Sequence, residues 1–221
     1  WGLEDEFVSS PKLDDLQCAF VSLKALLASH NEKDISVFCC FDNEEVGSNT
    51  KQGAMSTFFV DTLKRIHCSL GKTESEYYPA IAKSFMVSCD NAHAVHPNHP
   101  KKTDAVNCAY MNKGVVIKES ANQKYTTDAF SRSVFMEICH KANMPYQTFA
   151  NRSDSLGGST LGNLSNTQVS LHCVDIGLPQ LAMHSTFETG GVEDTATTIE
   201  ILKTFYDTDI EIHNFDSVDF N

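Results

Sequence analysis

The segment FDNEEVGS, residues 41–48, places three acidic side chains close behind an apolar run. Asp42, Glu44 and Glu45 follow ISVFCC, which is typical of a buried strand. Carboxylates gathered in one place raise each other's pKa values, whereas a divalent cation makes the same cluster favourable. The segment therefore indicates a site that holds a cation or a proton. A solvated turn or a charge at a helix start is the plainer structural explanation.

Two further apolar runs are associated with polar clusters. Asp90, with His93 and His96 behind it, ends the run SFMVSC, and Asp175, with His184 further on, belongs to LHCVDIG. In open α/β sheets the carboxyl ends of the strands line the binding crevice, so we expect these clusters to converge there. Carboxylate and imidazole ligands together suit zinc, manganese or cobalt better than calcium, which prefers oxygen ligands. The pattern favours a metal centre that supports hydrolysis.

The neighbours Glu44 and Glu45 suggest two different roles. On an extended backbone, successive side chains point to opposite faces, so both are not expected to bind one ion from the same side. One carboxylate can then bind a metal ion while the other acts as a general base toward water.

Each of the other candidates also has a purely structural interpretation. Asp14 precedes a helical pattern, where an acid commonly caps the helix. His184 in QLAMHS fits a hydrogen-bonded core histidine. His93 and His96 lie three residues apart, and the following Pro97 favours a loop over a shared helix face. Residue types and spacing alone therefore predict an acidic α/β domain, with a metal hydrolase as one interpretation.

The elements that must position these residues alternate between helices and strands. Helical periodicity predicts helices over 15–30, 51–70, 128–142 and 193–206, and apolar runs predict strands over 34–42, 84–90, 114–118, 146–150 and 171–177. Gly71 is the expected stop of the second helix. Segments 93–104 and 151–163 are expected to be loops. The alternation is typical of one α/β domain with a mostly parallel, helix-covered sheet.

Composition narrows the class of protein. The chain has 221 residues, a hydrophobic share of 41% and a net charge of -12, which disfavours nucleic acids and anionic membranes as partners. No apolar stretch approaches the about 20 residues that cross a bilayer, and WGLEDEFVSS lacks the features of a signal peptide. The eight cysteines form no CxxC pair, which favours a reducing compartment over a disulfide framework. We expect a cytoplasmic protein.

Six stretches occur in one order between residues 5 and 206. They are KLDDLQ, FDNEEVGSNTKQGA, VSCDNAHAVHPNHP, GVVIKESANQKYTTDA, GGSTLGN and VDIGLPQLAMHS. In these stretches the chain resembles the aspartyl aminopeptidase and vacuolar aminopeptidase I family of zinc metallopeptidases, in its bacterial more than its animal branch. The resemblance implies a metal-dependent aminopeptidase with a mixed, mostly parallel central sheet flanked by helices.

The resemblance also implies a role for each clustered residue. Asp14 would bridge two divalent ions. Glu45 and His184 would complete the shell of one ion, and Asp90 would bind the other. Glu44 would be the general base. Zinc is the expected metal, with manganese or cobalt as alternatives, and two ions about 3.5 to 4 Å apart would polarise the scissile carbonyl.

Three further residues are implied in substrate binding. Lys118 matches a family lysine that is associated with acidic substrates. The association is reasonable because an ammonium in a partly dry pocket selects a carboxylate. An ordinary strand-end lysine is the structural alternative, and Tyr125 would be a companion of Lys118 in the pocket. Gly158, in the loop GGST, would let backbone N–H groups approach the substrate.

The chain departs from the family pattern at one point. The family completes the ion held by Asp90 with an upstream histidine in an H-x-D arrangement, and no His-x-Asp occurs in the 221 residues. We therefore expect residues 1–221 to be the C-terminal part of a catalytic domain, without the N-terminal segment and the dimerisation domain. Such a site should bind the ion next to Asp90 weakly.

Three hypotheses for the function follow. The first is a dinuclear aminopeptidase that removes N-terminal residues, preferably Asp or Glu, from peptide substrates. The second is a non-catalytic fragment or assembly subunit that retains the fold, and the third is a related dinuclear deacylase. The clustered acids favour the first, because burying carboxylates without a function is costly. The resemblance implies a homo-oligomer in the intact form, and the net charge of -12 argues against nucleic-acid and membrane partners.

Overall fold

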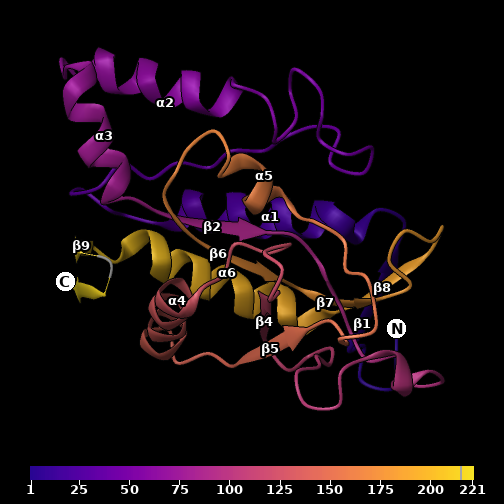
Figure 1. Cartoon of the computed structure of the whole chain (residues 1–221). Helices are drawn as coiled ribbons and strands as arrows, with labels where there is room; N and C mark the ends of the chain where they lie inside the picture. Colours follow the sequence, from indigo (N-terminus) through magenta and orange to yellow (C-terminus); the bar gives the residue numbers. More distant parts are fainter. Residues whose placement is uncertain (215) are drawn as a thin grey trace.

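The centre of the computed structural model, which describes residues 1–214 and 216–221, is a mixed four-stranded sheet (Figure 1). Its order is β2-β6-β4-β5, with the bounds β2 Phe85–Cys89, β6 His172–Gly177, β4 Val115–Glu119 and β5 Tyr146–Ala150. β2 pairs with β6 and β4 with β5 in parallel, while β4 and β6 run antiparallel. The predicted mixed, mostly parallel sheet is confirmed.

Three helices cover one face of this sheet. They are α1 Leu13–Ala28, α4 Ala129–Lys141 and α6 Val192–Asp207, and α1 packs along α6. Val174 and Ile176 of β6 point to this face and are fully buried in the main core with residues of all three helices. Because side chains alternate along a strand, Asp175 between them points to the opposite face. Each such aliphatic side chain contributes about 1.5 to 3 kcal/mol on burial.

Shorter elements lie around the opposite face and the ends of the sheet. They are β1 Phe7–Ser10, α2 Phe58–Ser69, α3 Glu74–Ala82, β3 Ala92–His93, η1 Pro100–Lys102, α5 Leu161–Ser165, β7 Pro179–Leu181, β8 Glu188–Gly191, β9 Ile210–Asn214 and β10 Ser217–Phe220. A second sheet has the order β1-β8-β7-β3, and β9 and β10 form a hairpin. None of the helices in the described part of the chain combines the length and apolar character needed to cross a membrane.

The two four-stranded sheets are continuous along the chain. β3 follows β2 after two residues, and β7 follows β6 after one. Backbone hydrogen bonds continue through this junction, from Asp90 N–H to Ile176 O (3.1 Å) and from Ala92 N–H to Leu178 O (2.8 Å). Asp90 and the residues after it are therefore held rigidly where the sheets meet.

Most predicted elements form where the sequence places them. Asp128 caps α4 by accepting from Ser131 N–H (2.8 Å), while Asp128 N–H donates to Ser131 Oγ (3.0 Å). The helix predicted from residue 51 begins only at Phe58, because turns around Gly53 occupy its first part. It ends as expected before Gly71, which has φ of +75°. The loops predicted over 93–104 and 151–163 contain η1 and the start of α5.

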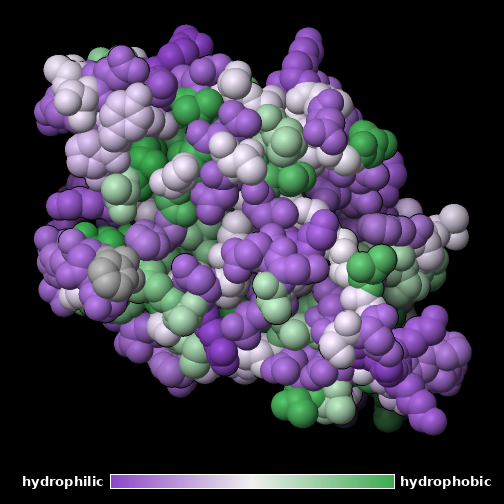
Figure 2. Space-filling view, viewed as in Figure 1, coloured by the Kyte–Doolittle hydropathy of each residue, from purple (hydrophilic) through white to green (hydrophobic). Residues whose placement is uncertain are grey.

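The strand predicted over 34–42 does not form, and this prediction is wrong. A strand needs backbone partners, but a cavity of about 660 Å³ lies between this segment and β2, the edge strand of the central sheet. Residues of α1 and of the α2–α3 region line the same cavity. Ile35 is left 63% exposed. Figure 2 shows hydrophobic residues reaching the surface below the α2–α3 layer.

Candidate metal centre

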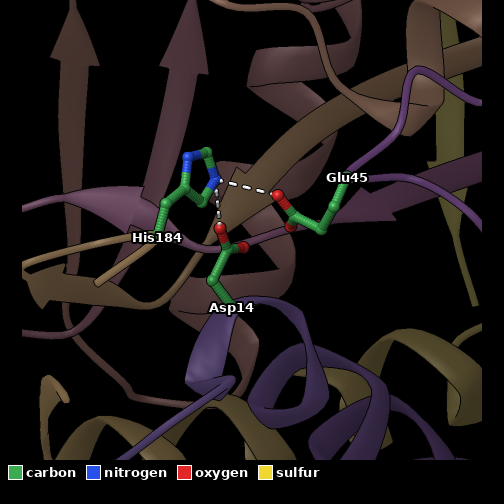
Figure 3. A group of neighbouring side chains, drawn as sticks. All are labelled: Asp14, Glu45 and His184. Carbon is green, nitrogen blue, oxygen red and sulfur yellow. Dashed lines mark ion pairs between the residues drawn. The ribbon is translucent and has the colours of Figure 1, made fainter. Parts of the chain in front are cut away.

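Asp14 lies at the start of α1 without capping the helix. Its backbone angles (φ -81°, ψ 111°) and those of Asp15 are not helical, and Lys12 occupies the N-cap position. The peptide bond between Asp14 and Asp15 is cis. The Asp14 side chain points away from the helix toward His184 (Figure 3). The N-cap interpretation of Asp14 is therefore wrong.

Two carboxylates from distant parts of the chain lie next to the imidazole of His184 (Figure 3). His184 Nε2 lies 2.9 Å from Asp14 Oδ2 and 3.1 Å from Glu45 Oε2. Asp14 comes from the start of α1, Glu45 from the loop 41–48, and His184 from the connection between β7 and β8. The His184 side chain is 64% exposed, which excludes a core histidine.

A second group of carboxylates shares Asp14 with the first. Asp14, Asp15 and Asp90 each offer an oxygen within 4.8 Å of the others, as do the ligand atoms of Asp14, Glu45 and His184. Asp14 Oδ1 is buried and has no hydrogen-bond partner among the described residues. A buried acceptor without a donor, surrounded by other carboxylates, fits a divalent cation. The oxygen and imidazole donors suit zinc, manganese or cobalt.

Crowding of the carboxylates shifts their proton affinities. Burial, with the charges of Asp90 and Glu45, raises the pKa of Asp14 to about 8. The same three causes raise the pKa of Glu44 to about 7, and burial above all raises the pKa of Asp15 well above its usual range. A carboxylate that titrates near pH 7 is suited to general-base catalysis. A divalent cation would favour the charged forms of all these groups.

The loop that carries Glu44 and Glu45 is a turn and not an extended strand end. Gly47 N–H donates to Glu44 O (2.8 Å) and Ser48 N–H to Asn43 O (2.9 Å). Gly47 has φ of +98°, which favours glycine. The premise that the two glutamates alternate along extended backbone is therefore wrong. In the turn, Glu45 reaches His184, while Glu44 is half-buried.

Asp90 is held by the buried ammonium of Lys118. Lys118 is 2% exposed, and its Nζ donates to Asp90 O (2.7 Å) and Asn91 O (3.3 Å) and lies 3.4 Å from Asp90 Oδ2. Burial opposes the charged form, but Asp90 and Asp175 outweigh it and raise the pKa of Lys118 above its usual range. A Cβ on Gly177 would overlap the Asp90 carbonyl oxygen, so only glycine fits there. The interpretation of Lys118 as an ordinary strand-end lysine is wrong.

The other substrate-binding candidates lie in different surroundings. The Tyr125 ring centroid is 5.3 Å from Lys118 Nζ, and Tyr125 is 7% exposed. Gly158 lies in an exposed loop, and a Cβ added to it would meet no described atom within 4 Å. His93 ends β3, and desolvation, followed by the charges of Lys118 and His184, lowers its pKa.

A buried polar network behind the cluster has no signal in the sequence pattern. Asn91 Nδ2 donates to Gln17 Oε1 (3.1 Å) and also to Gln180 Oε1, and Cys18 Sγ donates to Asn91 Oδ1 (2.8 Å). These bonds join α1 to the junction of the two sheets. The sequence pattern also does not identify Glu188, at the start of β8. Glu188 follows His184 by four residues, and this spacing indicates a shared face only in a helix, whereas the segment here is a loop. Only tertiary contacts identify these residues.

Comparison with known proteins places the chain in a family. The sequence profile of the family described as Aminopeptidase I zinc metalloprotease (M18) matches residues 1–206. This chain belongs to the M18 family. The resemblance drawn from the six sequence stretches is thereby confirmed.

Relatives and solved structures give the extent of the M18 match. The chain is 49% identical over 205 residues to probable M18 family aminopeptidase 2 of Clostridium novyi and 39% identical over 211 residues to aspartyl aminopeptidase 1 of Schizosaccharomyces pombe. Each alignment covers 93% of this chain but only 47% or 44% of the relative. The chain thus spans about half the length of the curated relatives it matches. The S. cerevisiae mApe1 dodecamer structure superposes with a TM-score of 0.77 at 25% identity, over 93% of this chain and 47% of that one.

Proposed function

We propose that this M18 chain carries the metal ligands and the general base of an aminopeptidase, a hydrolase that removes N-terminal residues from peptides. The observation that carries the proposal is the convergence of Asp14 and Glu45 on His184 Nε2, at 2.9 and 3.1 Å. The half-buried Glu44, with a pKa raised to about 7, lies in the adjoining turn. The M18 match supports this class of reaction.

The proposed cofactor is a pair of divalent ions, zinc first and manganese or cobalt as alternatives. Glu45 and His184 would hold one ion and Asp90 the other, with Asp14 shared between them. The membership of Asp14 in both ligand groups supports this assignment. A bound divalent ion supplies Lewis-acid chemistry, because it polarises the scissile carbonyl and lowers the pKa of water.

Glu44 would move the protons of the reaction. Its carboxylate accepts a proton from the attacking water and passes that proton to the leaving amine as the C–N bond of the peptide breaks. Without metal the pKa of Glu44 is raised to about 7, and a bound cation would favour its charged form, which is the form that accepts a proton from water.

The proposed substrates are peptides with an acidic N-terminal residue. The name of the S. pombe relative and the buried ammonium of Lys118 support this preference. Because Lys118 already donates to Asp90, it would act on a substrate carboxylate through its field, with Tyr125 beside it. Gly158 would let backbone N–H groups approach the substrate. Lys118→Ala also leaves Asp90 unpaired, so kcat should fall for every substrate, but KM should rise more for Asp than for Leu substrates. An equal rise in KM for both would contradict the preference.

The proposed assembly is a homo-oligomer, and the proposed location is the cytoplasm. The dodecameric mApe1 structure supports the first and the acidic composition the second. Analytical ultracentrifugation of the protein and fractionation of the cells that produce it test the two proposals separately.

Two measurements on the chain test the function. Elemental analysis after dialysis against zinc should find bound metal in the wild-type chain and less in His184→Ala. Assays with Asp and Leu anilides then separate an aminopeptidase from a non-catalytic subunit. A chain that takes up no divalent metal would overturn the metal centre, whereas metal uptake without hydrolysis of either anilide would favour the non-catalytic alternative.

A further inference from the structure

One buried carboxylate contacts the backbone of two proposed metal ligands. Glu188 Oε2 accepts from Asp14 N–H (2.9 Å), and Glu188 Oε1 accepts from His184 N–H (2.6 Å). Glu188 is 2% exposed. Each oxygen of the same carboxylate therefore holds a different ligand, and the two ligands come from opposite ends of the sequence.

The backbone of Glu188 belongs to a strand that is paired on both sides. Glu188 starts β8, which pairs antiparallel with β1, where Ser10 is opposite Glu188, and with β7. His184, by contrast, has φ of +65°, a conformation that non-glycine residues rarely adopt without support from their surroundings. The rigid strand can therefore impose a position on the less regular segments that carry Asp14 and His184.

The charge of Glu188 is not matched by a basic side chain. No side-chain nitrogen of Lys, Arg or His lies within 4.0 Å of its carboxylate in the part of the chain that the structure describes, although Glu188 is 2% exposed. A buried carboxylate without a cationic partner is costly. A cation bound by Asp14 and His184 would lie close to the Glu188 carboxylate, which accepts from the backbone N–H of both ligands, and would lower the cost of burying this charge.

We propose that Glu188 is a positioning residue that sets the spacing of Asp14 and His184 and thereby the affinity of the metal centre. This inference rests on the proposed function, since it needs the metal centre to exist. Partners that orient metal ligands typically change metal affinity by about 10- to 100-fold when they are replaced.

The test replaces one acceptor oxygen with a donor. In Glu188→Gln the side chain keeps its size, but its NH2 group faces one of the two backbone N–H donors, so only one of the two hydrogen bonds can form. The matched control is Glu193→Gln, because Glu193 is exposed in the first turn of α6 and its side chain contacts neither ligand. Zinc affinity is measured by competition with a chelator on the 221-residue chain. The visible absorption spectrum with Co²⁺ then reports the ligand geometry.

Glu188→Gln should bind zinc about 10- to 100-fold more weakly than wild type and shift the Co²⁺ spectrum, while Glu193→Gln should match wild type in both. Zinc affinity within about twofold of wild type, with an unchanged Co²⁺ spectrum, would overturn the role of Glu188 but leave the metal centre intact. A wild-type chain that binds neither metal would overturn the proposed function, and the role of Glu188 with it.

A second measurement does not depend on folding of the variant. In the wild-type chain, amide hydrogen exchange at Asp14 and His184 should be slow, because both N–H groups donate to a buried carboxylate. Exchange of either amide at the rate of an unstructured peptide would overturn the proposed positioning of Asp14 and His184 by Glu188, even if Glu188→Gln failed to fold.

Discussion

Asp14 contributes two carboxylate oxygens and a backbone N–H to the site. One of its oxygens faces His184, the other is buried without a described partner, and its N–H donates to Glu188. Burial and the neighbouring carboxylates raise its pKa to about 8. The metal-free arrangement is thus unfavourable at neutral pH, and a bound cation would relieve it.

Glu44→Gln separates the proposed base from the proposed ligands. The amide cannot accept the proton of water, so turnover in an active preparation should fall by at least about 100-fold. Metal content should stay the same, because Glu45 and not Glu44 reaches His184. Elemental analysis and an Asp anilide assay check both results, with Glu74→Gln, exposed in α3, as the control. A variant that loses its metal would contradict the assignment.

The raised pKa values predict an unusual dependence of metal-free stability on pH. Asp14 and Glu44 titrate at about 8 and about 7 in the fold, against ordinary values of 3.8 and 4.5. The folded state therefore binds more protons than the unfolded state between about pH 4 and 8, so these groups lower the free energy of unfolding as the pH rises.

Asp14→Asn isolates the share of this effect that comes from Asp14, because the amide does not titrate. In the presence of EDTA, the variant should gain stability relative to wild type as the pH is raised from 5 to 8. Urea unfolding followed by circular dichroism measures the difference. A difference that stays constant over this range would show that Asp14 titrates at its ordinary pKa.

The buried pair of Lys118 and Asp90 should contribute strongly to stability. Lys118→Met removes the cation and leaves Asp90 buried and unpaired, for which we expect a loss of about 3 to 5 kcal/mol in the free energy of unfolding. Lys113→Met, at an exposed position, is the control and should change stability by about 0.5 kcal/mol or less. A loss below about 1 kcal/mol for Lys118→Met would mean that water replaces the ammonium.

Single elements show how far the sequence pattern reaches. The helix of residues 128–142 and the strand of residues 146–150 are predictable because capping, periodicity and apolar runs are local properties. The run ISVFCC has the same local signature but no strand partner beside it, and pairing is not a local property. For the same reason the two-residue β3 and the short strands β7 and β8 escape prediction.

The candidate site likewise combines residues that can be predicted from the sequence with contacts that cannot. Asp14, Glu45 and His184 could be named from sequence because the family resemblance supplied them, and the structure brings these three together. The turn at Glu44, the burial of Lys118 and the hydrogen bonds of Glu188 depend on contacts between distant segments. No spacing rule expresses such contacts.

The cap of α4 gives a prediction at the scale of one element. Asp128→Ala removes the side-chain acceptor for Ser131 N–H and should lower the free energy of unfolding by about 1 kcal/mol. Asp61→Ala in the first turn of α2 removes an exposed acid that is not the capping residue, and it should cost clearly less. Thermal unfolding of both variants tests the difference. Equal losses would mean that helix charge and not capping is responsible.

At the scale of the whole molecule, a bound ion should stabilise the folded state, because its ligands come from distant segments. The proposed ligands come from α1, the loop 41–48, the end of β2 and the β7–β8 connection, so metal bound only by the folded state stabilises all of them together. Zinc at about 1,000 times its dissociation constant should add about 4 kcal/mol to the free energy of unfolding. His184→Ala should lose most of this gain in a melting experiment. An equal gain in the variant would place the zinc elsewhere.

The distance along the chain between Asp14 and Glu188 also sets an order of events during synthesis. The two residues are 174 positions apart, which a ribosome needs roughly 10 to 35 s to translate at about 5 to 20 residues per second. Until residues 184–188 are translated, the nascent chain carries Asp14 and Glu45 without His184, which contacts both, and without Glu188, which accepts from Asp14 N–H. The segment that carries Asp14 can therefore acquire its final place only after residues 184–188 have been translated.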